Sequence, residues 1–145
     1  MAKLMFGFNK DELEKAGLTE NDILSMVRDY AGKNNISEKE NIVFESDSSE
    51  KLMEIGISVM SRKYSYLQCI ESLVLDNGNE KKDLKDEHMK WLKDGKLAQI
   101  HLSLEQAMKV KEHKIPFKIK FGYSNTVILF IQKKFFYEIQ DIIFG

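Results

Sequence analysis

The sequence predicts an α+β fold, with about six helices packed on a small mixed or antiparallel sheet that ends in a C-terminal hairpin. Apolar residues at helical spacing alternate along the chain with short segments of strand-type composition. Residues 115–132 hold two strand-type runs on either side of a turn. One proline and eight glycines in 145 residues argue against long linkers, so we expect a single domain over residues 1–145.

The first third of the chain is expected to contain two strands and two helices. Residues 3–8 alternate weakly, as a short strand does. Asn9 is typical of a helix N-cap, and Gly17 ends the helix that it opens. Thr19 caps a second helix, whose first turn is acidic and whose apolar residues recur every three or four positions. A compact strand follows at residues 41–45.

The middle of the chain is expected to be helical. A helix begins at Ser48 or Ser49, and its apolar residues recur at i, i+3, i+4, i+7 and i+8. Residues 65–75 have the composition of a strand but the spacing of a helix, and we expect a helix there. Residues 80–93 form a charged helix.

The last third is expected to contain the hairpin and two helices. Pro116 bars a helix, so the residues that follow it are assigned to a strand. The expected elements are a strand at 97–102, a helix capped by Ser103, a strand at 115–121, a return strand at 126–132 and a helix within 133–144.

Composition indicates a cytoplasmic protein with no membrane association. The longest apolar run, residues 126–131, is far shorter than the roughly 18 residues that a membrane helix needs. The N-terminal apolar run is too short for a signal peptide. A single cysteine, Cys69, excludes an internal disulfide and fits a reducing compartment.

Charge is unevenly distributed, although the net charge is −1. Residues 1–75 carry 9 basic and 13 acidic groups, whereas residues 76–145 carry 13 and 10. Seven lysines and one acid lie within residues 109–134. This excess of lysine would attract phosphate or an acidic protein surface, or it is the solvated face of a strand.

No catalytic constellation is present in the sequence, so we expect a protein that is not an enzyme and has no cofactor or metal. The three histidines are twelve or thirteen residues apart, without the spacing of metal ligands. Cys69 lies among apolar residues, as a packed core thiol does. A site assembled from distant residues, for example His101 with a carboxylate, remains open because it leaves no local signature.

Two short segments resemble a known family. Residues 65–70 read Ser-Tyr, an aliphatic residue, a polar one, a small one and an aliphatic one, and residues 76–80 (Asp-Asn-Gly-Asn-Glu) lead into a charged helix. This arrangement resembles the helical module of tailed-phage late-transcription coactivators. The terminal segment 140–145 is similar to peptides that bind the replication sliding clamp. The resemblance implies docking on RNA polymerase through the module and on the clamp through the terminus.

We therefore expect a non-catalytic regulatory module that binds a larger protein, and the resemblance implies that it is phage-encoded and related to transcription. The expected partner-binding residues are Trp91, Gln140, Ile143 and Phe144, together with the lysines between positions 109 and 120. One alternative is nucleic-acid binding by a basic sheet within residues 109–134, through Lys118, Lys120, Tyr123, Lys133 and Lys134. Another is an inhibitor or immunity-type protein that uses the acidic N-terminal half, through Asp11, Glu12, Glu14, Glu20, Asp22 and Asp29.

Overall fold

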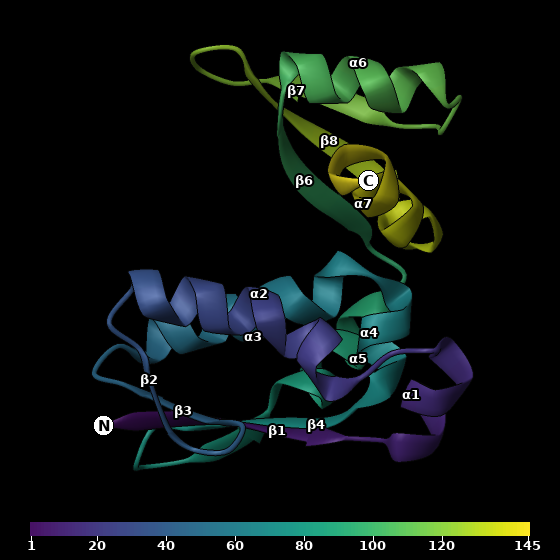
Figure 1. Ribbon diagram of the computed structural model, residues 1–145. Coiled ribbons are helices and arrows are strands. Elements are labelled where there is room, and N and C mark those ends of the chain that lie inside the picture. The colour runs from purple at the N-terminus through teal and green to yellow at the C-terminus, as the bar shows by residue number, and fades with distance from the viewer. The chain divides into compact units, whose positions relative to one another are not determined.

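The computed structural model of the protein describes residues 1–145, which divide into two units, Met1–Trp91 and Leu92–Gly145. Each unit is an antiparallel sheet with helices packed on it (Figure 1). The prediction of an α+β fold is thus confirmed, with seven α-helices. There are two sheets, of five and three strands, where the sequence suggested one. The single domain stays a prediction.

The first unit has a five-stranded sheet in the order β2-β3-β1-β4-β5. Helices α2 and α3 lie over one face of this sheet (Figure 1). Its elements are β1 (Ala2–Phe8), α1 (Lys10–Ala16), α2 (Glu20–Lys33), β2 (Ser37–Glu40), β3 (Val43–Ser46), α3 (Ser49–Arg62), α4 (Tyr64–Cys69), β4 (Ile70–Asp76), β5 (Lys81–Asp83) and α5 (Leu84–Lys93), which crosses the unit boundary.

Side-chain caps fix where the first helices begin, as the sequence predicts. Asn9 accepts a hydrogen bond from the backbone N–H of Glu12 at 3.1 Å, and Gly17 ends α1 with a φ of 67°. Thr19 and Asp22 form a reciprocal capping box at the start of α2.

The central strands bury every second residue against the helices. In β1, Leu4 and Phe6 are buried, and in β3 Phe44 is fully buried. Leu4 pairs with Phe44 across the ladder, and the Phe6 and Phe44 rings meet edge to face with centroids 5.8 Å apart. This aromatic cluster is the centre of the first core.

The expected helix over residues 65–75 is wrong beyond Cys69, where β4 begins. Phe8 pairs with Ile70 but its neighbour Gly7 pairs with Ser72, so Glu71 is a bulged residue. The bulge directs both Ile70 and Leu73 into the core, which creates a helix-like spacing of three within a strand.

Two short edge strands were not predicted. The expected strand at 41–45 begins at Val43, because the preceding residues turn the chain out of β2 and Ile42 has a φ of 61°. The helix expected from position 80 begins at Leu84, after β5. The Asp83 carboxylate accepts hydrogen bonds from the backbone N–H groups of Leu73 and Lys85, at 3.1 and 3.0 Å, and so holds the helix start against β4.

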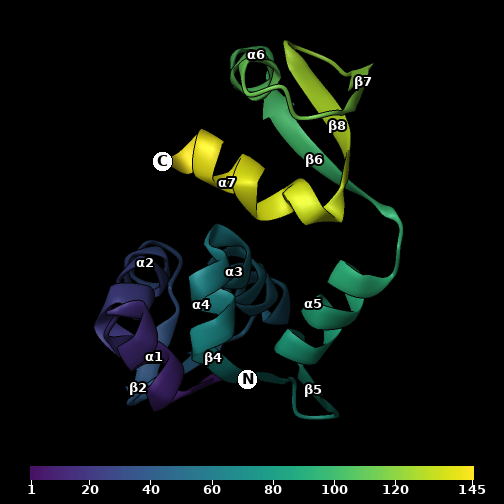
Figure 2. The same ribbon diagram turned by 90° about the vertical axis from the view of Figure 1, so that its right-hand side faces the viewer.

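The second unit has a three-stranded sheet in the order β6-β8-β7. Helices α6 and α7 lie on the same side of it (Figure 2). Its elements are β6 (Leu97–Ser103), α6 (Leu104–Glu112), β7 (Lys118–Phe121), β8 (Thr126–Gln132), a 3-10 turn η1 (Lys133–Phe135) and α7 (Phe136–Phe144). The predicted C-terminal hairpin, formed by β7 and β8, is confirmed.

The two units carry opposite net charge. Residues 1–91 have 13 basic and 18 acidic side chains, a net charge of −5, whereas residues 92–145 have 9 lysines and 5 acids, a net charge of +4.

None of the helices combines the length and the apolar character needed to cross a membrane.

Two helical glycines give a matched prediction about packing. A Cβ atom at Gly56 in α3 would lie 2.9 Å from Leu84 Cδ1 and 3.1 Å from Leu73 Cδ2, whereas one at Gly32 in α2 would meet nothing within 4 Å. We expect Gly32→Ala to raise the free energy of unfolding by up to about 1 kcal/mol, the difference in helix propensity. Gly56→Ala should not raise the free energy of unfolding, because the new methyl group overpacks the core. Urea unfolding of the two variants measures the difference, and an equal gain in both would contradict the close approach.

Candidate binding groove

A groove lies between α6 and β7 in the second unit. It has a volume of about 570 Å³, within the usual range for ligand sites. A neighbouring hollow of about 540 Å³, at the start of α6, shares Leu104 and Met108 with it. The groove is lined by Leu104, Ala107, Met108, Lys111, Ile119, Phe121 and the turn that contains Lys114, Ile115, Pro116 and Phe117.

Helix α6 forms one wall of the groove, and part of its apolar surface is exposed there. The helix is fixed at its start by a capping box between Ser103 and Gln106. Ala107 and Val110 are buried. Leu104 and Met108 point past that contact and remain 41% and 51% exposed.

Strand β7 forms the other wall. Ile119 pairs with Leu129 of β8 and Phe121 pairs with Val127, and both partners are buried. Directly paired residues share a face of the sheet, so Ile119 and Phe121 lie on the helix side. They are nevertheless 40% and 71% exposed, because nothing in the unit covers the end of that face. Exposed apolar residues that gather along one groove make it a candidate interaction surface.

Lysines border this apolar wall. Lys111 and Lys114 line the groove itself. Lys118 and Lys120 pair with Phe130 and Ile128, so they emerge on the opposite face of β7. All four lysines are exposed, and the unit has a net charge of +4. The surroundings therefore favour an acidic ligand.

No family model, curated protein or solved structure matches the chain. The groove is accordingly interpreted from its own residues.

The expected partner-binding residues do not gather in this groove. Trp91, near the end of α5, is half-buried, and its ring stacks on that of His88 with centroids 5.4 Å apart. Gln140, Ile143 and Phe144 belong to α7, in which Ile139 is fully buried. The terminal residues are thus part of a folded helix, and Phe144 is 55% exposed at its end.

The expected nucleic-acid contacts divide into two sets. Lys118 and Lys120 share the open face of the sheet with Phe130, and Tyr123 is 93% exposed in the hairpin turn. The Lys133 side chain, in contrast, is only 6% exposed and donates a hydrogen bond to the Asp94 carboxylate. This hydrogen bond lowers the pKa of Asp94. Lys133 is therefore engaged within its own unit and is a poor candidate for a phosphate contact.

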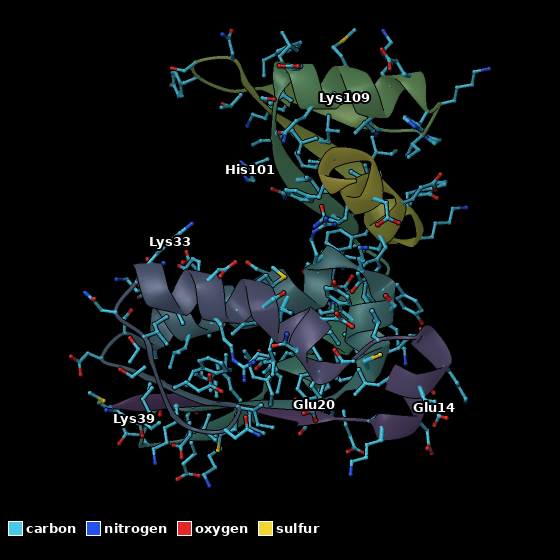
Figure 3. The ribbon with its side chains drawn as sticks, viewed as in Figure 1. Glu14, Glu20, Lys33, Lys39, His101 and Lys109 are labelled. Carbon is cyan, nitrogen blue, oxygen red and sulfur yellow. The ribbon has the colours of Figure 1, made fainter.

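The candidate catalytic groups are scattered. His88 is on α5, His101 is on β6 and His113 follows α6 (Figure 3 labels His101). Burial lowers the pKa of His88, and burial likewise raises the pKa of the Cys69 thiol, the opposite of what activates a nucleophile. Neither hollow of the second unit is lined by a histidine or cysteine.

The acidic residues of α1 and α2 are spread over the surface of the first unit. Figure 3 labels Glu14 and Glu20, both exposed. Part of this charge serves the helices themselves, because Asp22 accepts a hydrogen bond from the backbone N–H of Thr19 at 2.7 Å. Glu12 forms an ion pair with Lys15 at 3.6 Å.

Sequence reasoning missed Leu104 and Met108 as binding residues. Both belong to the apolar stripe of α6 and read as core. The signal available in the sequence was the strand Lys-Ile-Lys-Phe, in which two isolated apolar residues alternate with lysine.

Proposed function

We propose that the protein is a non-catalytic interaction module that captures an apolar and acidic segment of a larger protein in the α6–β7 groove. The observation that supports this most strongly is the uncovered apolar wall of Leu104, Met108, Ile119 and Phe121, bordered by lysines. Apolar anchors bind in such a groove, and the surrounding charge selects among ligands and speeds their association.

The groove is tested by selecting peptides from a random display library against the full chain and measuring their affinity for three proteins. We expect the selected peptides to be rich in acidic and apolar residues and to bind the wild type. Met108→Asp, which places a negative charge in the groove, should weaken their binding at least about tenfold. Ile57→Asp is the matched control, because Ile57 is a helical residue of the first unit with 45% exposure. Equal affinity for all three proteins would contradict the proposal.

The more specific form of this proposal is a cytoplasmic, phage-encoded transcription coactivator. It rests on the sequence resemblance at residues 65–70 and 140–145, with RNA polymerase and the sliding clamp as partners. In the protein the first segment is helix α4 with the first residue of β4, and the second is the last turn of α7. Binding of purified clamp to the full chain, compared with a Phe144→Ala variant, tests the terminal segment.

A second candidate function is single-stranded nucleic-acid binding on the open face of the second sheet. It is favoured by Phe130, which lies directly across the ladder from Lys118, because bases stack on aromatic rings and nearby cations contact the phosphates. Fluorescence anisotropy with a labelled oligothymidylate at about 50 mM salt tests it. Affinity that is lost in Lys118→Glu and kept in Met108→Asp would favour nucleic acid over the peptide.

A further inference from the structure

We infer that the captured segment adds to the sheet as a fourth strand beside β7, and that it alternates acidic with apolar residues. This inference rests on the proposed function of the groove and specifies both the conformation and the sequence pattern of the partner.

Strand β7 has an open edge. In the order β6-β8-β7 it pairs with β8 on one side only, over Lys118–Phe121. In an antiparallel ladder every second residue directs its N–H and C=O away from its partner. These groups are available to a further extended chain, which is how many recognition domains bind peptides.

The dimensions of α6 and β7 match. A helix of nine residues is about 14 Å long, and a strand of four residues spans about 13 Å. A peptide that pairs with the whole of β7 therefore passes beside the groove that α6 also lines. Its core is four to five residues long.

The sequence of β7 determines which side chains this strand prefers. A residue placed opposite Ile119 or Phe121 points into the groove, towards Leu104 and Met108. A residue placed opposite Lys118 or Lys120 points to the other face of the sheet. Directly opposed side chains interact favourably when both are apolar or when they carry opposite charges. The complement of Lys-Ile-Lys-Phe is thus acidic, apolar, acidic, apolar.

The same pattern disfavours a second copy of this chain. Two β7 strands can pair, parallel or antiparallel, in two kinds of register. In one kind, the lysines of one strand lie directly opposite the lysines of the other. In the other kind, shifted by one residue, each lysine lies on the same face of the sheet as Ile119 or Phe121 of the other strand. Like charges directly opposed across a ladder are destabilising, and lysines on an edge strand hinder self-pairing in this way.

The test uses the full chain and fluorescent peptides with the core Asp-Ile-Glu-Val-Asp. Four comparison peptides are required: the scrambled core Asp-Asp-Ile-Val-Glu, the alternating core N-methylated at its odd-numbered amides, the same core N-methylated at its even-numbered amides, and the basic core Lys-Ile-Lys-Val-Lys. Anisotropy gives the affinities, and amide hydrogen exchange reports protection of residues 118–121. Analytical ultracentrifugation gives the oligomeric state.

We expect the alternating acidic peptide to bind about tenfold or more tightly than the scrambled peptide and to slow exchange in β7. One of the two N-methylated peptides should not bind, because its methyl groups replace the backbone N–H groups that face β7. In the double variant Lys118→Glu, Lys120→Glu the preference between the acidic and basic peptides should reverse. A Lys118→Gln, Lys120→Gln variant serves if the reversal impairs folding, and it should reduce the preference for the acidic peptide.

Four results would overturn the inference. Unchanged binding of both N-methylated peptides means that only side chains dock, and the groove then still functions as proposed. The same conclusion follows if library-selected peptides bind and depend on Met108 but the alternating core does not bind. The groove then functions as proposed, without strand addition. A dimer whose interface protects β7 identifies a second copy as the occupant. If none of the designed peptides binds, and no library-selected peptide loses affinity in Met108→Asp, the proposed function of the groove is contradicted as well.

Discussion

Replacement of Phe44 by alanine is expected to lower the free energy of unfolding by about 3–5 kcal/mol, the usual cost of removing a buried phenyl ring. Phe44 is 0% exposed and lies across the ladder from Leu4, with the Phe6 ring against its edge. The deletion leaves a cavity that the paired strands cannot close. Because domains are stable by only about 5–15 kcal/mol, this change removes a large part of the margin.

The matched control for this prediction is Phe121→Ala. The side chain removed is the same, but Phe121 is 71% exposed, and the expected loss of stability is below about 0.5 kcal/mol. Urea unfolding combined with amide hydrogen exchange over residues 2–91 measures the effect where it arises. Similar losses in the two variants would mean that Phe44 is not a core residue. Phe121→Ala should instead weaken peptide binding, which separates the groove from the core.

Replacement of Leu129 by alanine is expected to destabilise the second unit by about 2–5 kcal/mol. Leu129 is 0% exposed and lies on the middle strand, between Ile100 of β6 and Ile119 of β7. Leu129 therefore occupies the centre of the buried side of this sheet. Hydrogen exchange over residues 97–132 reports the loss.

Ile128→Ala is the control for Leu129, because it removes the same number of carbon atoms from the adjacent residue. Ile128 points to the opposite face of the sheet and is half-buried. Its replacement should cost only about 1 kcal/mol. An equal or larger loss at Ile128 would show that the face assigned as open is covered.

Local chemistry made much of the secondary structure predictable. The caps at Asn9, Thr19, Ser48 and Ser103 each accept a backbone hydrogen bond at the helix start where the sequence places one. These bonds form between residues three apart, so a short window of sequence contains all the information needed. The hairpin was predictable for the same reason.

The remaining secondary structure could not be predicted locally because it depends on pairing between strands that are far apart in the sequence. The strand character of Ile70–Asp76 depends on its ladder with β1, more than sixty residues earlier in the chain. The bulge at Glu71 further disguised it by producing a spacing of three. Edge strands such as Ser37–Glu40 consist of exposed residues and have no apolar alternation to detect.

The candidate groove could not be predicted because it exists only where apolar residues of α6 and β7 are left uncovered by the rest of the fold. The stripe of α6 predicts a buried side, and Ala107 and Val110 are indeed buried. Whether Leu104 and Met108 are also covered depends on the tertiary contacts of the helix. Those contacts follow from the packing of α6 on the sheet of β6, β8 and β7, which no local pattern encodes.

The opposite charges of the two units have a consequence for the protein in concentrated solution. A net charge of −1 suggests weak forces between molecules, but each molecule carries an acidic portion of −5 and a basic portion of +4. At low ionic strength the acidic portion of one molecule attracts the basic portion of the next, and the Debye length of about 30 Å at 0.01 M allows this attraction to act across a domain. At about 0.15 M salt the range falls to about 8 Å. Turbidity and light scattering should therefore decrease as salt is added.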